Sequence, residues 1–176
     1  GEGMLVRFWG VRGSVPTPGP RTVRYGGNTS CVEVQHGDDR LILDSGTGIC
    51  ELGRTLAAGS DPVRVKLLIS HTHMDHIQGF PFFVPAFIEG NHIRVYGPKD
   101  FDKGIYDIIS IQMDYSVFPV RVDELAAHLE FHDVLAQNFA LDSFSVQAQP
   151  LNHPILTLGY RIEVDGEVMI SFGSKK

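Results

Sequence analysis

Hydrophobic residues gather along this chain in short runs that predict a strand-rich domain. Residues 29–35 alternate between apolar and polar side chains, as expected of a strand with one face in solvent. Residues 40–44 (RLILD) and 65–69 (VKLLI) are mainly apolar, which is typical of buried strands. The same criteria predict further strands at 4–8, 93–96, 129–132, 143–150, 156–164 and 167–172, the last two joined by a hairpin turn at Asp165-Gly166.

Two other stretches carry a helical period. Ile49, Leu52 and Leu56 follow one another at offsets of three and four within 45–58, and a similar spacing marks 101–113. Segment 79–90 is hydrophobic but broken twice by proline, so we expect a packed loop with short helical turns. Helices inserted between strands predict a single mixed α/β domain over residues 1–176, with helices covering the sheet faces.

Composition narrows the class of protein. A hydrophobic content of 43% and a charged content of 20% over 176 residues are ordinary for a globular domain that buries a real core. No apolar stretch reaches the ~20 residues that span a bilayer, and we recognise no signal peptide. Cys31 and Cys50 are too few for a disulfide framework, so we expect buried thiols and a cytoplasmic location. Residues 1–3 precede Met4 and are consistent with a tag remnant.

The distribution of charge bears on the substrate. A net charge of −6 argues against a broad nucleic-acid-binding surface. Residues 1–30 nevertheless hold four arginines against one glutamate, a local charge of +3 within a segment dense in glycine and proline. This segment is either an ordinary solvated loop or a flexible rim that receives an anion such as a phosphate. The sequence leaves both interpretations open.

The densest chemical signal lies directly after the predicted strand 65–69. His71, His73, Asp75 and His76 place four ionisable side chains within six residues. If the extended backbone continues past the strand, His71 and His73 converge on one point, whereas Asp75 and His76 aim elsewhere. Imidazole nitrogens and carboxylate oxygens are ligands preferred by Zn²⁺ and its first-row neighbours. We therefore expect metal binding here.

Several phrases of the sequence together resemble one protein family. They are FWGVRGSVPTPG (8–19), YGGNTSCVEV (25–34), ILDSGTGICELG (42–53), ISHTHMDHIQGFPFFVPAF (69–87) and NHPILTLGYRIE (152–163). The histidine motif resembles that of the metallo-β-lactamase superfamily, and the other phrases resemble the branch that includes ribonuclease Z and a cyclic phosphodiesterase. The resemblance implies an αβ/βα sandwich with a dinuclear site of zinc or manganese at one sheet edge.

The resemblance also implies roles for individual residues. His71, His73 and His153 would hold a first metal, and Asp75 and His76 a second. Asp75 would in addition orient the attacking water and shuttle its proton, which makes it the catalytic candidate. Asp44 would orient the metal site from outside the ligand set, and Arg12 and Asn28 are candidate substrate contacts. The remaining histidines, His36, His92, His128 and His132, match no family ligand and are expected in surface or packing positions.

One part of the family pattern fails. The family carries a strand that ends in an aspartate bridging both metals, and a later histidine that binds the second metal. The corresponding strand here reads VMISFGSKK, so that Gly173 or a neighbour stands in place of the aspartate. We therefore expect an incomplete sandwich that holds one or two ions. A shortened or altered chain, a natural truncation and completion by a second chain all remain open, and an uncovered sheet face would favour a homo-oligomer.

These observations predict a metal-dependent hydrolase that uses a metal-activated water. The most specific reading is a phosphodiesterase acting on a small phosphodiester or nucleotide-like substrate, without a membrane partner. A different class of function is a degenerate metal-binding domain that self-associates without turnover. Within the same fold, hydrolysis of a thioester or a lactam is a third alternative, since a metal-bound hydroxide also attacks carbonyl groups.

Overall fold

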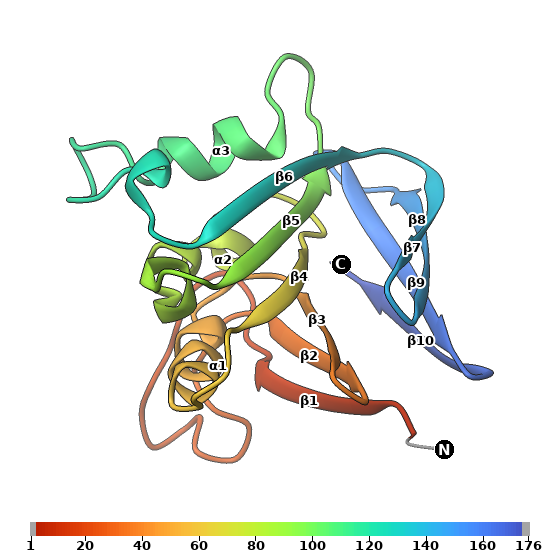
Figure 1. Ribbon diagram of the computed structural model, residues 1–176. Coiled ribbons are helices and arrows are strands. Elements are labelled where there is room, and N and C mark those ends of the chain that lie inside the picture. Colours follow the sequence, from red (N-terminus) through yellow and green to blue (C-terminus); the bar gives the residue numbers. More distant parts are fainter. Residues whose placement is uncertain (1–2, 174–176) are drawn as a thin grey trace.

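Two β-sheets packed face to face form the frame of the molecule, as the computed structural model shows for residues 3–173 (Figure 1). The first sheet has the order β1-β2-β3-β4-β5-β6, with β1 to β3 antiparallel and β3 to β6 parallel. Its strands are β1 (Leu5–Gly10), β2 (Cys31–His36), β3 (Asp39–Leu43), β4 (Arg64–Leu68), β5 (His92–Pro98) and β6 (His128–Val134). The second sheet is antiparallel in the order β10-β9-β8-β7, formed by β7 (Gln137–Leu141), β8 (Phe144–Leu151), β9 (Thr157–Val164) and β10 (Glu167–Phe172).

The central strands β3 and β4 are buried on both faces because each face meets a different layer. Ile42 and Leu67 belong to a hydrophobic cluster shared with the helical layer, whereas Leu43 and Leu68 belong to a cluster shared with the second sheet. The helical layer comprises α1 (Gly48–Ala57), the single turn α2 (Met74–Ile77), α3 (Ile105–Ile111) and the 3₁₀ turns Phe80–Phe82, Val84–Phe87 and Val122–Glu124. Burial on both faces thus explains the near-continuous apolar runs in the sequences of β3 and β4.

The predicted fold class is confirmed, and so are the predicted strands, the helix within 45–58 and the packed 79–90 loop with its short turns. The sequence pattern missed β7, an edge strand whose side chains are largely exposed and whose sequence therefore carries little hydrophobic contrast. It also placed the start of the third helix too early. Phe101 has a left-handed backbone (φ 40°) and Gly104 is extended, so the helix begins only at Ile105.

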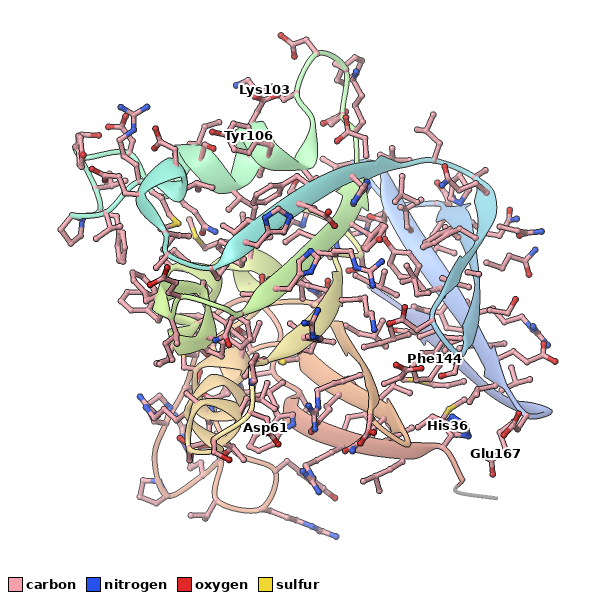
Figure 2. The ribbon with its side chains drawn as sticks, in the orientation of Figure 1. His36, Asp61, Lys103, Tyr106, Phe144 and Glu167 are labelled. Carbon is pink, nitrogen blue, oxygen red and sulfur yellow. The ribbon has the colours of Figure 1, made fainter. Side chains whose placement is uncertain are left out.

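Three side-chain expectations can be followed in the same frame. Cys31 is buried and Cys50 half-buried, both as free thiols, and burial raises the pKa of each. His36 serves in packing, with its ring edge-on to Phe144 of β8 at 6.4 Å between centroids (Figure 2). Among residues 3–173, no helix has the length and apolar character that crossing a membrane requires.

The second sheet is fastened to the first at the end of β4. The hydroxyl of Tyr160 on β9 donates a hydrogen bond to the carbonyl of Ile69 at 2.7 Å, and the amide of Leu158 donates to the carbonyl of Ser70 at 2.8 Å. Tyr160 is fully buried, and this burial raises the pKa of its hydroxyl well above the usual value. Both contacts fix the backbone immediately before the histidine motif.

We expect Tyr160→Phe to lower the free energy of unfolding by about 1–3 kcal/mol, because the buried carbonyl of Ile69 loses its donor while the ring still fills its space. Urea denaturation measures the change. Tyr25→Phe, at an exposed loop tyrosine, is the matched control and leaves the midpoint unchanged. An unaltered midpoint for Tyr160→Phe would contradict a structural role for this hydroxyl.

Candidate metal centre

The candidate metal centre lies at the carboxyl ends of β3 and β4. These two strands are parallel, with Leu43 paired to Leu68, so the segments that follow them emerge side by side. Asp44 follows β3, and the histidine motif follows β4. The backbone of His73 stays extended (φ −62°, ψ 148°) and precedes α2, which carries Asp75 and His76. The change from extended to helical backbone therefore divides the motif into two pairs, as their sequence spacing indicated.

His71, His73 and His153 converge on one point. One ring nitrogen from each lies within 4.8 Å of the others, and the ring centroids are 4.8 to 5.3 Å apart. His153 arrives from the loop between β8 and β9, so the second sheet contributes to the group. Its Nε2 atom is shielded from solvent and has no hydrogen-bond partner among the described residues. A metal ion would satisfy this nitrogen, and three imidazoles leave a fourth coordination position open, as in catalytic zinc sites.

Asp75 and His76 form a second pair beside the first group. Nε2 of His76 lies 3.4 Å from Oδ2 of Asp75, and its ring centroid lies 4.1 Å from that of His71. The backbone amide of Ser14 donates a hydrogen bond to Oδ2 of Asp75 at 2.8 Å. This contact ties the glycine- and proline-rich loop to the centre. The pair can supply one nitrogen and one oxygen to a second ion next to the first.

Asp44 connects the group of three histidines to the Asp75–His76 pair through hydrogen bonds. Its buried carboxylate accepts hydrogen bonds from the amide and hydroxyl of Ser70, at 2.7 and 2.9 Å, and from Nδ1 of His76 at 2.7 Å. The backbone of Asp44 is left-handed (φ 63°), a conformation uncommon for a residue with a side chain. It persists because the carboxylate is so completely bonded in this position.

This network selects the ring nitrogens that face the cavity. Because the Ser70 hydroxyl donates to Asp44, its oxygen is left to accept from Nδ1 of His71, 3.1 Å away. Nδ1 of His76 donates to Asp44 directly. In both histidines the lone pair therefore resides on Nε2, which is the arrangement that second partners impose on metal-binding histidines.

The network also shifts the affinity of two histidines for protons. Burial and the neighbouring His76 lower the pKa of His71 to about 4, so His71 is a neutral imidazole at neutral pH, the form that binds metal. Burial alone would lower the pKa of His76, but the hydrogen bond and charge of Asp44 outweigh it and raise this pKa. A metal at the second pair would therefore compete with a proton on His76.

The centre opens into a cavity of about 490 Å³. Arg12, Ser14, Pro154 and Gly173 contribute to its wall alongside the histidines and Asp75. A hollow of about 360 Å³ shares Val11, Arg12 and Gly13 with this cavity and is lined in addition by Arg21 and Arg24. Three of the four early arginines are thus gathered at the mouth of the site.

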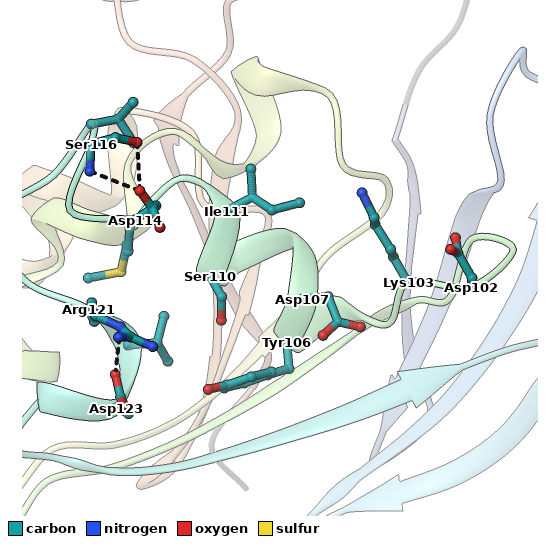
Figure 3. Close-up of a pocket in the computed structure, with 13 residues that line it drawn as sticks. Asp102, Lys103, Tyr106, Asp107, Ser110, Ile111, Asp114, Ser116, Arg121 and Asp123 are labelled. Carbon is teal, nitrogen blue, oxygen red and sulfur yellow. Dashed lines mark hydrogen bonds and ion pairs between the residues drawn. The ribbon is translucent and has the colours of Figure 1, made fainter.

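The larger cavity of the molecule, about 840 Å³, lies elsewhere (Figure 3). It borders α3, and Lys103, Tyr106, Asp107, Ser110, Arg121 and Asp123 contribute to its lining. None of the residues that the sequence marked for chemistry lines this cavity. The candidate metal centre is therefore distinguished by its ligand chemistry and not by its volume.

The structure separates the two candidate substrate contacts. Arg12 lines the cavity, whereas the side-chain oxygen of Asn28 accepts a hydrogen bond from the hydroxyl of Thr47 at 3.1 Å. Asn28 instead shapes the loop, because its carbonyl accepts the amide of Arg12 at 3.0 Å. Sequence reasoning missed Ser70 and Ser14; the position of Ser70 between the strand and the motif was the available signal, whereas Ser14 acts through its backbone and left none.

Gly173 occupies the wall of the cavity, where the resemblance implies a bridging aspartate. A Cβ atom built on Gly173 would overlap the side chain of Ser70. Asp75 is the one carboxylate among the described residues that line this cavity.

Comparison with known proteins agrees with this architecture. Residues 39–174 match a family described as the β-lactamase superfamily domain, and the chain therefore belongs to the metallo-β-lactamase superfamily. Its relatives place it on the ribonuclease Z-like branch. Ribonuclease Z of Exiguobacterium sibiricum is 28% identical over 140 residues, which cover 77% of this chain and 43% of that protein. Ribonuclease Z of Ligilactobacillus salivarius is 36% identical over 103 residues, which cover 56% of this chain and 30% of that protein.

Solved structures show the same fold. The metallo-β-lactamase fold protein YhfI of Bacillus subtilis superposes with a TM-score of 0.68 at 19% identity, covering 96% of this chain and 62% of that one. The short form of human tRNase Z superposes with a TM-score of 0.67 at 22% identity, covering 96% of this chain and 68% of that one. The chain spans less than half of the length of the two ribonucleases Z.

We expect Asp44→Asn to weaken metal binding by about 10–100-fold, because the amide NH₂ group cannot accept from His76 and would reverse the tautomers that Asp44 imposes. Metal retained after dialysis, measured by elemental analysis, reports the effect. Asp61→Asn changes an exposed carboxylate and is the control. Circular dichroism shows whether the variant is folded. A folded Asp44→Asn chain with normal metal content would exclude the orienting role.

Proposed function

We propose that this chain carries the metal-binding part of a metal-dependent phosphodiesterase that hydrolyses its substrate with an activated water. The observation that carries the proposal is the convergence of His71, His73 and His153 beside the Asp75–His76 pair within one cavity. The donors fit zinc, for which imidazole and carboxylate are usual ligands, and Mn²⁺ is the second candidate. In this proposal the first group holds one ion, and the second pair accommodates another.

The residues divide the work of hydrolysis. A divalent ion bound in such a site would lower the pKa of a coordinated water and would stabilise negative charge on the phosphoryl oxygens. Asp75, fixed by the amide of Ser14, orients the attacking water and accepts its proton. Asp44 acts through His71 and His76, holding both rings with Nε2 toward the cavity. Pre-set ligand orientation lowers the reorganisation needed when the substrate binds.

The mouth of the cavity favours a phosphate-bearing substrate. Arg12, Arg21 and Arg24 surround the adjoining hollow, and the Arg24 guanidinium lies over the ring of Tyr25 at 5.0 Å from its centroid. Arg7, the fourth arginine of the segment, lies apart from this group and pairs with Glu33 at 3.5 Å. Guanidinium groups bind phosphate oxygens in a fork geometry. The names of the similar proteins, ribonuclease Z and tRNase Z, favour a phosphodiester bond of RNA over that of a small molecule.

A second candidate is a metal-binding domain that self-associates without turnover. It is favoured by the single carboxylate among the described residues of the cavity, since no second carboxylate is present there to link two ions. The outer face of β10 also exposes Val168, Ile170 and Phe172 by 46, 53 and 57%. Alternate apolar residues on an edge strand are suited to pairing with a second copy of the chain. Thioester or lactam hydrolysis is a weaker alternative, because the arginines at the mouth match a phosphate better than a neutral carbonyl.

Elemental analysis combined with hydrolysis of bis-p-nitrophenyl phosphate separates the two candidates. The phosphodiesterase proposal expects turnover in Zn²⁺ or Mn²⁺ and a loss of about 100-fold or more in kcat for His73→Ala, because this residue is an essential ligand. His36→Ala, which alters a packing histidine, is the control. Turnover with near two ions per chain that are lost when His71 and His76 are replaced by alanine supports the enzyme. At most one such ion, without turnover, supports the binding domain.

The arginines at the mouth generate a separate expectation. Arg12→Ala should raise KM for an anionic phosphodiester about five- to tenfold and leave kcat largely intact, because it removes ground-state attraction for the phosphate. Arg54→Ala, at an exposed arginine on α1, is the control. Steady-state kinetics at low and high salt measures both constants. A fall in kcat with KM unchanged would refute a substrate-binding role for Arg12.

A further inference from the structure

A second group of side chains that could hold a metal ion lies at the opposite end of the first sheet. His92 begins β5, and His128 begins the neighbouring edge strand β6. The parallel register pairs these two histidines directly, and Glu130 follows two residues later on the same face of β6. Since β4 and β5 are also parallel, with Arg64 opposite His92, this group lies about 20 Å from the candidate metal centre along the strands.

The ligand atoms of the group already face one point. Oε2 of Glu130 lies 3.3 Å from Nε2 of His92, and Oε1 of Glu130 lies 3.5 Å from Nε2 of His128. The three ligand atoms lie within 4.8 Å of one another. Bonds of ~2.0–2.1 Å in a tetrahedral zinc site separate neighbouring ligand atoms by ~3.3–3.4 Å. The two separations, which involve the two different oxygens of Glu130, are close to that spacing and exceed the ~2.7–2.9 Å of a charged hydrogen bond.

One buried nitrogen in the group has a carboxylate beside it but no hydrogen bond of good geometry. Nε2 of His92 is shielded from solvent and makes no hydrogen bond within the described part of the chain, although Glu130 lies nearby. A buried polar atom without a partner is costly. A cation between the imidazole and the carboxylate would satisfy both.

The backbone beneath the group is fixed in advance. The amide of His128 donates to the carbonyl of Asn91 at 2.8 Å, and the amide of His92 donates to the carbonyl of Val63 at 2.9 Å. The buried side chain of Asn91 accepts from the amide of Val63 and donates to the carbonyl of Pro85. Ligands on pre-organised strands lose little conformational freedom on binding a metal.

Three cations lie near the group, and two of them are paired elsewhere. Arg64, opposite His92 in the register, lines the same hollow as His92. Arg94, opposite Glu130 in the register, forms an ion pair with Asp142 at 3.4 Å. Lys66 on the next strand is paired with the same aspartate. Both cations are therefore balanced by a carboxylate other than Glu130, which leaves Glu130 to the histidines.

We propose that His92, His128 and Glu130 form a second binding site for a divalent transition-metal cation of the zinc class. Two imidazole nitrogens and one carboxylate are a ligand set found in zinc proteins, and the partly exposed edge leaves at least one position for water. The ion would join the edge strand β6 to β5. The site is independent of the proposed function, because its three ligands lie outside the cavity of the candidate metal centre.

The test uses the full chain with His71, His73, His76 and His153 all replaced by alanine, which leaves Asp75 alone of the proposed ligands of the candidate metal centre. After treatment with chelator, calorimetric titration with Zn²⁺ is expected to show one ion per chain. Adding His128→Ala or Glu130→Gln should weaken this binding at least about tenfold, because each removes a direct ligand. His132→Ala is the matched control: its imidazole lies on the same strand, 3.8 Å from Glu130, but stacks on Tyr96 and is outside the group.

A background chain that binds no Zn²⁺, or binds it equally well after Glu130→Gln and His128→Ala, would overturn the proposal. If the background chain does not fold, the intact chain decides: His128→Ala should lower the Zn²⁺ content by one ion, and an unchanged content overturns the site. His128 is largely exposed, so its replacement leaves the core intact. Hydrolysis of bis-p-nitrophenyl phosphate by the His128→Ala chain should equal that of the unmodified chain, which separates failure of this site from failure of the proposed function.

Discussion

The buried carboxylate of Asp44 is the interaction on which the arrangement of the site depends. It stands where β3 ends and binds the backbone and side chain of the residue that follows β4, so it fastens two parallel strand ends together. An unpaired carboxylate in this position would be strongly destabilising, and the chain therefore cannot form this corner without also placing Ser70 and His76. From those two residues the orientation of the histidine rings follows. The fold and the candidate metal centre are thus determined by the same few hydrogen bonds.

The second sheet also positions the ligands of the candidate metal centre. Tyr160 and Leu158 hold the backbone before the histidine motif, while the loop ahead of β9 carries His153. Ligands from both sheets meet only when the sheets are packed on each other. A bound ion would therefore stabilise the packed state over any state in which the sheets separate, so metal affinity and fold stability are thermodynamically linked.

Much of this structure could be predicted from the sequence, for identifiable reasons. Strands that are buried on both faces have continuous apolar runs, and four ionisable side chains of metal-ligand type within six residues are a strong local signal. The edge strand β7 is largely exposed, so its sequence shows little alternation of apolar and polar residues. The left-handed backbone of Phe101 prevents the helix α3 from starting where the sequence pattern predicts. His153 could be placed only through family resemblance, because a lone histidine carries no local signal. The sequence predicts surface or packing positions for His92 and His128 and gives no signal for Glu130. Only the parallel register of β5 and β6 brings the three residues together.

The loop that gathers Arg12, Arg21 and Arg24 gives the molecule a strongly uneven electric field. The chain as a whole carries a net charge of −6, so an approaching polyanion is repelled by most of the surface and attracted at the mouth of the cavity. Such a field turns the partner before contact and selects productive encounters over random ones. Because charges are screened over ~8–10 Å at physiological salt, the electrostatic attraction acts over roughly the last 10 Å of approach. In the proposed function, the loop would govern how a substrate arrives, while the histidines would govern what happens afterwards.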